Sequence, residues 1–237
     1  MELRLDLHIH SERSPDGRMS LPQIAAAARA RGLQGVAICD HDRLCPQTAQ
    51  ETDLLIIRGE EFSTEYGHLL GLFLQEEIRP GSFREIVAAI HAQGGLAVLA
   101  HPFERHGESE RFAEILPLLD GIEVFNGRAN RKRKTANDEA AVLARVKGLP
   151  GFAGSDAHVP REIGNGYVTI QVETPDLSSI KAALLRPNNP VSGTDGRHLD
   201  VARSQHTKLK KTKAGPKQYA KWLLFAGKCL WEDLKKE

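Results

Sequence analysis

The sequence predicts an α/β fold in which strands and helices alternate around one largely parallel sheet. Seven short apolar runs, most of them followed by polar residues, alternate with amphipathic helical patterns. Seven strands without a glycine-rich dinucleotide fingerprint favour a barrel over an open sheet. The chain of 237 residues with 41% hydrophobic content is long enough for one sizeable core. A single barrel domain is therefore expected.

The elements of this barrel follow from local patterns. The predicted strands are short apolar runs typical of buried parallel strands, at residues 3–8, 35–40, 54–61, 68–74, 96–101, 121–126 and 151–156. The predicted helices show helical periodicity, and several begin near proline or end at glycine. They cover residues 21–32, 83–95, 131–148 and 175–186.

Composition excludes several classes of protein. The formal net charge of +1 gives no global sign of a polyanion-binding protein. No apolar stretch approaches the ~20 residues that a membrane span needs, and no signal peptide is recognisable at the N-terminus. The three cysteines, Cys39, Cys45 and Cys229, are too few for a disulfide framework in this chain. We expect a cytoplasmic protein.

Polar side chains gather at the ends of the predicted strands. They are His8 and His10, Asp40, His41 and Asp42, Glu60 and Glu61, His101, Asn126, and Asp156 with His158. In α/β barrels the functional groups project from the carboxyl ends of the strands, so these residues should meet at one mouth. His68 departs from the pattern because it stands at the start of the run 68–74.

The spacing of these residues predicts metal binding. Residues i and i+2 of a strand point to the same face, so His8 and His10 can hold one ion, and Asp156 with His158 repeats this spacing. A carboxylate such as Glu61 can bridge two ions. Imidazole and carboxylate ligands suit zinc, manganese or iron. Two such ions about 3.5–4 Å apart can hold a phosphoryl group and activate water.

Seven ordered motifs give the pattern a family resemblance. DLHIHS, ICDHD, GEEFS, HLLGLF, LAHPF, EVFN and GSDAH follow one another between about residues 5 and 170. They resemble the successive motifs of the PHP (polymerase and histidinol phosphatase) family of metal-dependent phosphoesterases. The resemblance implies a distorted (β/α)7 TIM-like barrel of the PHP type with two or three divalent ions at its mouth.

The resemblance also implies a ligand set for each ion. These are His8, His10, Glu61 and Asp156 for a first metal; Glu61, His68 and His101 for a second; and Asp16, His41 and His158 for a third. The third set carries a catalytic role, because its ion, or His158 without one, would position the phosphate or assist the leaving oxygen. Cys39 replaces the family's usual threonine and is expected to pack in the core.

Further residues are predicted to support the metals or the substrate. Asp6, Asp40 and Asp42 are expected to orient the ligating imidazoles through their second nitrogen. Arg128, Arg131 and Arg161 follow strand ends and are candidate phosphate contacts, with a solvated surface position as the alternative. Asn126 is a candidate for holding a water or a substrate oxygen, or for a turn.

The C-terminal part of the chain differs from the barrel at residues 1–190. Residues 191–237 predict a basic linker followed by an amphipathic helix, which packs on the barrel or on a partner. The stretch 203–221 holds seven basic residues and no acidic one, which allows contact with nucleic acid. The predicted apolar stripe comprises Tyr219, Leu223, Ala226, Leu230 and Leu234. Solvated lysines on a docked helix, and an oligomer contact, are the alternatives.

Taken together, the residues predict a hydrolase that acts on phosphoric esters through metal-activated hydroxide. The expected substrate is a phosphomonoester, either a nucleotide or a small phosphorylated metabolite. An exonuclease acting on short oligonucleotides is the alternative, encouraged by the basic stretch. A non-catalytic scaffold in nucleic-acid processing is less favoured, because the ligand positions are all filled.

Overall fold

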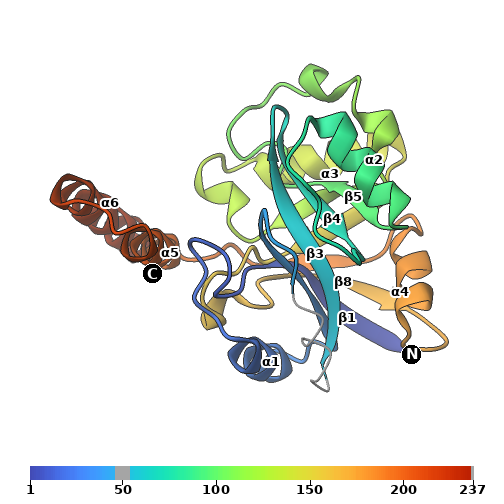
Figure 1. The fold of residues 1–237 in the computed structure, drawn as a ribbon, viewed down its shortest axis with the longest axis horizontal. Coiled ribbons are helices and arrows are strands. Elements are labelled where there is room, and N and C mark those ends of the chain that lie inside the picture. The colour runs from blue at the N-terminus through green and yellow to red at the C-terminus, as the bar shows by residue number, and fades with distance from the viewer. Residues whose placement is uncertain (46–53, 236–237) are drawn as a thin grey trace.

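The protein folds as one curled sheet surrounded by helices (Figure 1), in a computed structural model that describes residues 1–45 and 54–235. The strands of this described part are β1 Glu2–Ile9, β2 Gly35–His41, β3 Leu55–Thr64, β4 Gly67–Leu72, β5 Leu96–Leu99, β6 Gly121–Asn126, β7 Gly151–Gly154, β8 Gly166–Gln171 and β9 Val191–Gly193. Their order in the sheet is β7-β6-β5-β4-β3-β2-β1-β8-β9. The predicted barrel class is confirmed.

The sheet comes close to closure where β7 meets β1. Ile9 and Ala157 form a parallel bridge just beyond the end of β7. The Asp156 amide donates to the His8 carbonyl at 2.8 Å, and the His10 amide donates to the Ala157 carbonyl at 2.8 Å. The barrel is therefore nearly closed, and the contacts between its two sides lie where the predicted metal ligands are.

All seven predicted strands are present within a few residues, but the sheet is not uniformly parallel. Strand β4 runs antiparallel to both β3 and β5. Only Glu65 and Tyr66 separate β3 from β4, and a connection this short permits a hairpin but no parallel crossover. The two strands that were not predicted, β8 and β9, are also paired in antiparallel fashion.

The reversed direction of β4 explains the position of His68. Because β4 runs against its neighbours, its first residues lie at the same edge as the last residues of β3 and β5. His68 pairs with Ser63 near the end of β3, and its carbonyl accepts from the Ala100 amide just after β5. A histidine at the start of this strand thus reaches the same mouth as histidines at the ends of the others.

A bulge in β1 aims the first two histidines into the barrel. The pairing of β1 with β2 shifts register between Asp6 and Ile9. Leu5 and Leu7 pack with Ala37 in the barrel interior, whereas Ile9, which follows the bulge, packs outside the sheet. Bulges of this kind change the direction of side chains beside functional sites.

The helices cover the outside of the barrel. They are α1 Leu21–Ala30, α2 Phe83–Ala92, α3 Ala136–Lys147 and α4 Leu177–Leu184, with short 3-10 helices at Glu110–Phe112, Leu116–Leu118, Ala129–Arg131 and Pro160–Glu162. Helix α2 begins with a capping box, in which the Glu85 amide donates to the Ser82 hydroxyl and the Glu85 carboxylate accepts from the Ser82 amide. Part of the link between β2 and β3, residues 46–53, lies outside the described residues.

The C-terminal residues form a helical hairpin rather than a linker and one helix. Helix α5 spans His198–Lys211 and α6 spans Pro216–Leu234, and both project from the side of the barrel (Figure 1). Asp233 of α6 accepts from the amides of His198 at 2.8 Å and Leu199 at 3.0 Å, which caps the start of α5. The predicted basic linker is therefore wrong over α5. No helix in the described part is long and apolar enough to span a membrane.

The apolar stripe predicted on α6 does not pack on the barrel. Leu223, Leu230 and Leu234 are 63%, 46% and 56% exposed. The face that is turned inward instead holds Cys229 and Asp233, both buried. Contact with α5, including the Asp233 cap, selects this face of the helix.

The close approach of β7 to β1 generates a stability prediction. A Cβ atom at Gly154 would lie 2.3 Å from His8 Cβ and 2.7 Å from His8 N. We predict that Gly154→Ala lowers the free energy of unfolding by about 1–3 kcal/mol, because rigid backbone must move. Chemical denaturation measures this change.

Gly227→Ala in α6 is the matched control for this variant. A Cβ atom there meets nothing within 4 Å, and the residue lies in a helix interior. The control should unfold with a free energy up to about 1 kcal/mol higher than the wild type. Equal stability of the two variants would contradict the role given to Gly154.

Candidate metal centre

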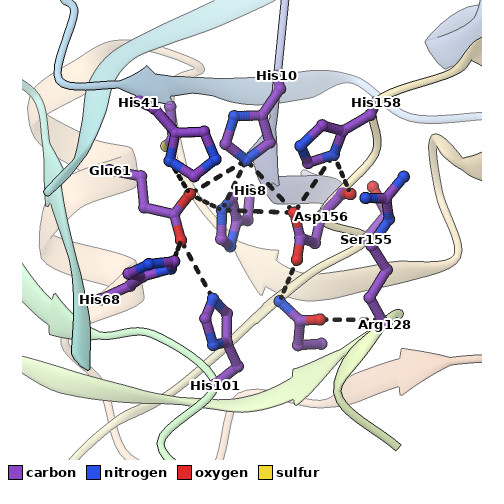
Figure 2. Close-up of polar contacts among 12 residues, drawn as sticks. His8, His10, His41, Glu61, His68, His101, Arg128, Ser155, Asp156 and His158 are labelled. Carbon is purple, nitrogen blue, oxygen red and sulfur yellow. Dashed lines mark hydrogen bonds and ion pairs between the residues drawn. The ribbon is translucent and has the colours of Figure 1, made fainter. Parts of the chain in front are cut away.

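The predicted ligands converge at the mouth of the barrel, and Figure 2 labels all of them except Asp16. Strands and the loops that follow them supply each side chain, and almost all are buried or half-buried. The cluster consists of His8, His10, Asp16, His41, Glu61, His68, His101, Asp156 and His158. The structure thus brings together every residue that the resemblance placed at a metal.

Glu61 lies at the centre of this cluster. Its Oε2 atom is 3.0 Å from His41 Nδ1 and 3.3 Å from His10 Nε2. Its Oε1 atom is 2.7 Å from His68 Nδ1 and 3.1 Å from His101 Nε2. The two oxygens of one carboxylate therefore face two different groups of imidazoles, as a bridging ligand must.

His8 and His10 turn their Nε2 atoms toward each other at 3.2 Å. His8 Nδ1 lies 3.0 Å from the Glu123 carboxylate, and His10 Nδ1 lies 3.2 Å from the Ser14 hydroxyl, which itself donates to Asp16. Both Nδ1 atoms are therefore placed as donors, so each Nε2 offers a lone pair to a cation once its own proton is displaced. Two lone pairs at this distance fit a shared cation.

A third group repeats this arrangement. His158 Nδ1 donates to the backbone carbonyl of Asp156 at 2.9 Å, so its Nε2 carries a lone pair. That Nε2 lies 3.3 Å from Asp16 Oδ1, and His41 Nε2 lies 3.6 Å from Asp16 Oδ2. A carboxylate faces one imidazole lone pair here, which again fits a cation.

His68 gives an independent sign that this part of the cluster fits a cation. Its Nδ1 atom is buried and lies 2.7 Å from Glu61 Oε1, yet within the described part of the chain it makes no hydrogen bond of acceptable geometry. A close but misdirected contact between two potential ligands is what a common metal ion would produce. The donor set is nitrogen and carboxylate oxygen, which suits manganese, zinc or iron.

The ligand atoms fall into three overlapping groups, within each of which they lie no more than 4.8 Å apart. The groups are His8, His10 and Asp156; His8, Glu61 and His101; and His10, Asp16, His41 and His158. The membership differs slightly from the sets implied by the resemblance. Glu61 groups with His8 and His101, and His10 also joins the third group. The assignment of each residue to one ion stays a prediction.

Charges within the cluster perturb the pKa values of its members. Burial alone would raise the pKa of Glu61, but the charges of His68, His41 and His8 lower it well below its usual range. Burial would lower the pKa values of His10 and His101, yet neighbouring carboxylates raise both to about 9. Without cations, protons on these imidazoles balance the carboxylates. Metal binding would displace those protons.

His158 behaves differently from the other imidazoles. Burial and the nearby charge of Arg128 lower the pKa of His158 to about 4. The ring is therefore neutral at pH 7, and its lone pair is available without loss of a proton.

Glu123 is a supporting residue that the sequence analysis missed. Its carboxylate accepts from His8 Nδ1 at 3.0 Å, from the His101 amide at 2.8 Å and from Asn126 Nδ2 at 3.0 Å. It holds the His8 imidazole in a fixed tautomer and orientation. The signal available was a glutamate within the otherwise apolar run 121–125.

Asn126 supports a ligand and does not face substrate. Its side chain is fully buried, and its amide lies 3.5 Å from Asp156 Oδ2. Its Oδ1 accepts from the Arg128 amide at 2.9 Å. With both ends of the amide engaged, the prediction that it holds a water or a substrate oxygen is wrong.

Arg128 is also wrongly predicted as a phosphate contact. Its Nε and Nη2 atoms donate to both oxygens of Glu162 at 2.8 and 2.6 Å, and Nη1 donates to the Ser204 hydroxyl at 3.2 Å. The guanidinium is buried by these partners. Arg131 is half-buried beside Phe225, and Arg161 is exposed near Asp200, so their roles stay predictions.

The three aspartates predicted to orient imidazoles have other contacts. Asp6 accepts from the amides of Ser155 and Gly164, both at 2.9 Å, and burial raises its pKa to about 6. Asp40 accepts from the Ser11 amide at 2.7 Å. Asp42 is exposed. Asp6 and Asp40 therefore fix the backbone of loops that carry ligands, and the predicted imidazole contacts are wrong.

Lys211 of α5 is a second supporting residue that was missed. Its ammonium donates to the carbonyls of Glu12, Ser14 and Gly17 at 2.6, 2.7 and 2.7 Å. These carbonyls belong to the loop that carries Asp16. Cys39, by contrast, is buried in the core among apolar side chains, in agreement with its predicted packing role.

The Glu123 contacts predict an effect on metal affinity. We expect Glu123→Gln to weaken metal binding by about 10–100-fold, because the His8 ring loses its charged acceptor. Isothermal titration with Mn²⁺ and Zn²⁺ measures the change. Gln171→Glu, an isosteric change in the reverse direction on an exposed side chain of β8, is the control. Unchanged affinity in Glu123→Gln would contradict this assignment.

The Lys211 contacts predict an effect on the third group of ligands. Lys211→Met removes three charge-assisted hydrogen bonds from the Asp16 loop, and we expect the occupancy of the weakest-bound metal to fall first. Metal content by mass spectrometry after graded dialysis measures this. Lys210→Met, an exposed neighbour on α5, should retain wild-type content. Equal loss from both variants would argue against the Lys211 contact.

Comparisons with known proteins agree with this geometry. The PHP domain family model matches residues 6–124, and the PHP-associated family model matches residues 134–188. An uncharacterized protein of Methanocaldococcus jannaschii is 32% identical over 195 residues, which cover 77% of this chain and 78% of that protein. A 5'-3' exoribonuclease of Haemophilus influenzae is 35% identical over 81 residues, or 30% of this chain and 29% of that enzyme.

A solved structure shares the fold. It is a two-domain protein of Bacteroides vulgatus that contains a predicted PHP-like metal-dependent phosphoesterase, with a TM-score of 0.68 and 19% identity. The match covers 87% of this chain and 70% of that one. Together with the ligand cluster at the barrel mouth, the family matches show that this chain belongs to the PHP family of metal-dependent phosphoesterases.

Proposed function

We propose that this chain hydrolyses a phosphomonoester of a nucleotide or a small phosphorylated metabolite. The observation that supports the proposal most directly is the convergence of imidazole lone pairs and carboxylates on common points at the barrel mouth. Such a centre would hold two or three divalent ions. When bound, these ions lower the pKa of coordinated water to about 7 and neutralise charge on a phosphoryl group.

Each group of side chains in the cluster would have its own role. His8, His10, Asp156 and Glu61 would hold one ion, and Glu61 would also serve, with His68 and His101, as a ligand of a second. Asp16, His41 and His158 would hold the third ion; without that ion, His158 would position the phosphate or assist the leaving oxygen. The neutral His158 ring, whose pKa is about 4, is suited to act as a ligand or acceptor at pH 7. Asn126 and Glu123 keep Asp156 and His8 in place.

Exonuclease action on short oligonucleotides is the second candidate. It needs the same centre, and it is supported by the likeness of part of the chain to the exoribonuclease of Haemophilus influenzae. The scaffold alternative is disfavoured, because a protein without catalysis has no need of a complete set of buried ligands. Arg131 and Arg161 remain candidates for phosphate contact in either reaction.

Product analysis tests the proposal. The manganese-loaded protein is incubated with a 5′-phosphorylated trinucleotide, and products are resolved by chromatography over time. Release of inorganic phosphate with an intact trinucleotide is expected for a phosphomonoesterase. Stepwise release of mononucleotides would identify the exonuclease instead. Removal of metal by a chelator should abolish turnover, and added Mn²⁺ should restore it.

Asp156→Asn separates the metal centre from contaminating activity. The variant should lose more than about 100-fold in turnover, because loss of even a supporting residue costs 10–100-fold. Asp138→Asn, on the exposed side of α3, is the matched control. Full activity in Asp156→Asn with an unchanged unfolding transition would refute the proposed centre.

A further inference from the structure

A cleft lies between the metal centre and the C-terminal hairpin. It has a volume of about 770 Å³, within the range typical of ligand sites. The barrel mouth supplies one side, which includes Asp16, His41 and His68. Helices α5 and α6 supply the other side, which includes Lys208, Lys221, Trp222 and Phe225.

We propose that this cleft binds a single-stranded oligonucleotide whose terminal phosphate ester reaches the metal centre. The hairpin would contact the phosphates and bases that follow the reacting group. The inference rests on the proposed phosphoesterase function and names its substrate class. It holds whether the centre removes a terminal phosphate or a terminal nucleotide.

The charges on the hairpin fit additional phosphates. Lys208 and Lys221 are exposed, and neither forms an ion pair with a carboxylate in the described part of the chain. They belong to the stretch 203–221, which has seven basic residues and no acidic one. On the barrel side, Asp16 is engaged by His41 and His158, and Asp42 is the other carboxylate of the cleft. Metal ions alone would hold a single small phosphate, so two lysines across the cleft favour a longer polyanion.

The aromatic residues of this wall are held rigidly. Trp222 donates its Nε1–H to the Ala202 carbonyl at 2.8 Å and stacks on His206 with ring centroids 4.5 Å apart. Phe225 lies beneath the Arg131 guanidinium at 5.8 Å. Aromatic side chains beside a basic groove are the usual means of binding single-stranded nucleic acid without sequence preference.

The hairpin is also fixed relative to the centre. Lys211 binds three carbonyls of the Asp16 loop, and Ser204 accepts from Arg128 at 3.2 Å. The family models match residues 6–124 and 134–188 only. This second wall is therefore built from residues outside the matched family segments.

Binding measurements with matched charge changes test the inference. Fluorescence anisotropy follows a labelled hexanucleotide with phosphorothioate linkages on the full-length, manganese-loaded protein. Lys208→Ala combined with Lys221→Ala should raise Kd at least tenfold. It should also reduce the slope of log Kd against log salt by about 1.4, because each phosphate contact contributes about 0.7 for single strands.

Lys217→Ala combined with Lys228→Ala is the control. Both residues are exposed on the same hairpin, but they do not line the cleft, so the net charge changes equally. The control should change Kd less than twofold. If both double variants change Kd equally, with unchanged melting temperatures, the cleft is not the binding site. The oligonucleotide would then be attracted only by the net charge of the protein. Phe225→Ala should weaken binding further without altering the salt slope.

A small substrate separates this inference from the proposed function. Hydrolysis of p-nitrophenyl phosphate reports on the centre alone. If it fails while the hexanucleotide binds as predicted, the proposed phosphomonoesterase function falls and the cleft stands. If hydrolysis proceeds but no hexanucleotide binds, the cleft assignment falls. Binding to phosphatidylserine vesicles in place of the hexanucleotide would likewise overturn it and assign the lysines to a membrane surface.

Discussion

The Glu61 carboxylate is the group around which the rest of the site is arranged. It is 1% exposed, and a buried carboxylate is costly unless it is paired with positive charge. Its two oxygens face imidazoles that come from β1, from the end of β2, from the reversed strand β4 and from the end of β5. The curvature of the sheet brings these four imidazoles together around Glu61. They balance its negative charge either by carrying protons or by binding metal ions.

The buried carboxylates of Asp6 and Glu162 secure backbone rather than imidazoles. Asp6 holds the start of the loop after β7, and Glu162 accepts from the His158 amide at 2.9 Å. The residues between and beside these contacts include backbone of unfavourable shape. Asp156, next to Ser155, has a φ angle of 54°, and His101, whose amide donates to Glu123, has a φ angle of 27°. Residues other than glycine adopt such angles at a cost, and they persist where the surrounding structure determines them. The positions of the ligands thus depend on hydrogen bonds made by carboxylates that are not ligands themselves.

How much of this could be predicted from the sequence depends on how far apart the interacting residues lie. The strands and the ligands at their ends were predictable, because a run such as 35–40 followed by His41 carries both signals locally. The reversal of β4 and the bulge in β1 were not predicted, since pairing partners decide them. Arg128 illustrates the same limit. Its position after a strand suggested a phosphate contact, but Glu162, 34 residues away, buries it.

The C-terminal hairpin contributes both to the metal centre and to the cleft beside it. The ligand groups that include Glu61, His8 and His101 lie on strands of the barrel or directly after them, so the sheet fixes their positions. The Asp16 loop has no such strand beneath it, and it is held from outside by Lys211 of α5, which reaches across 197 residues of sequence to Ser14. The helix that carries Lys211 also presents Lys208 to the cleft. One element therefore positions the third group of ligands and forms the opposite wall, so the geometry of this part of the centre and the shape of the cleft are set together.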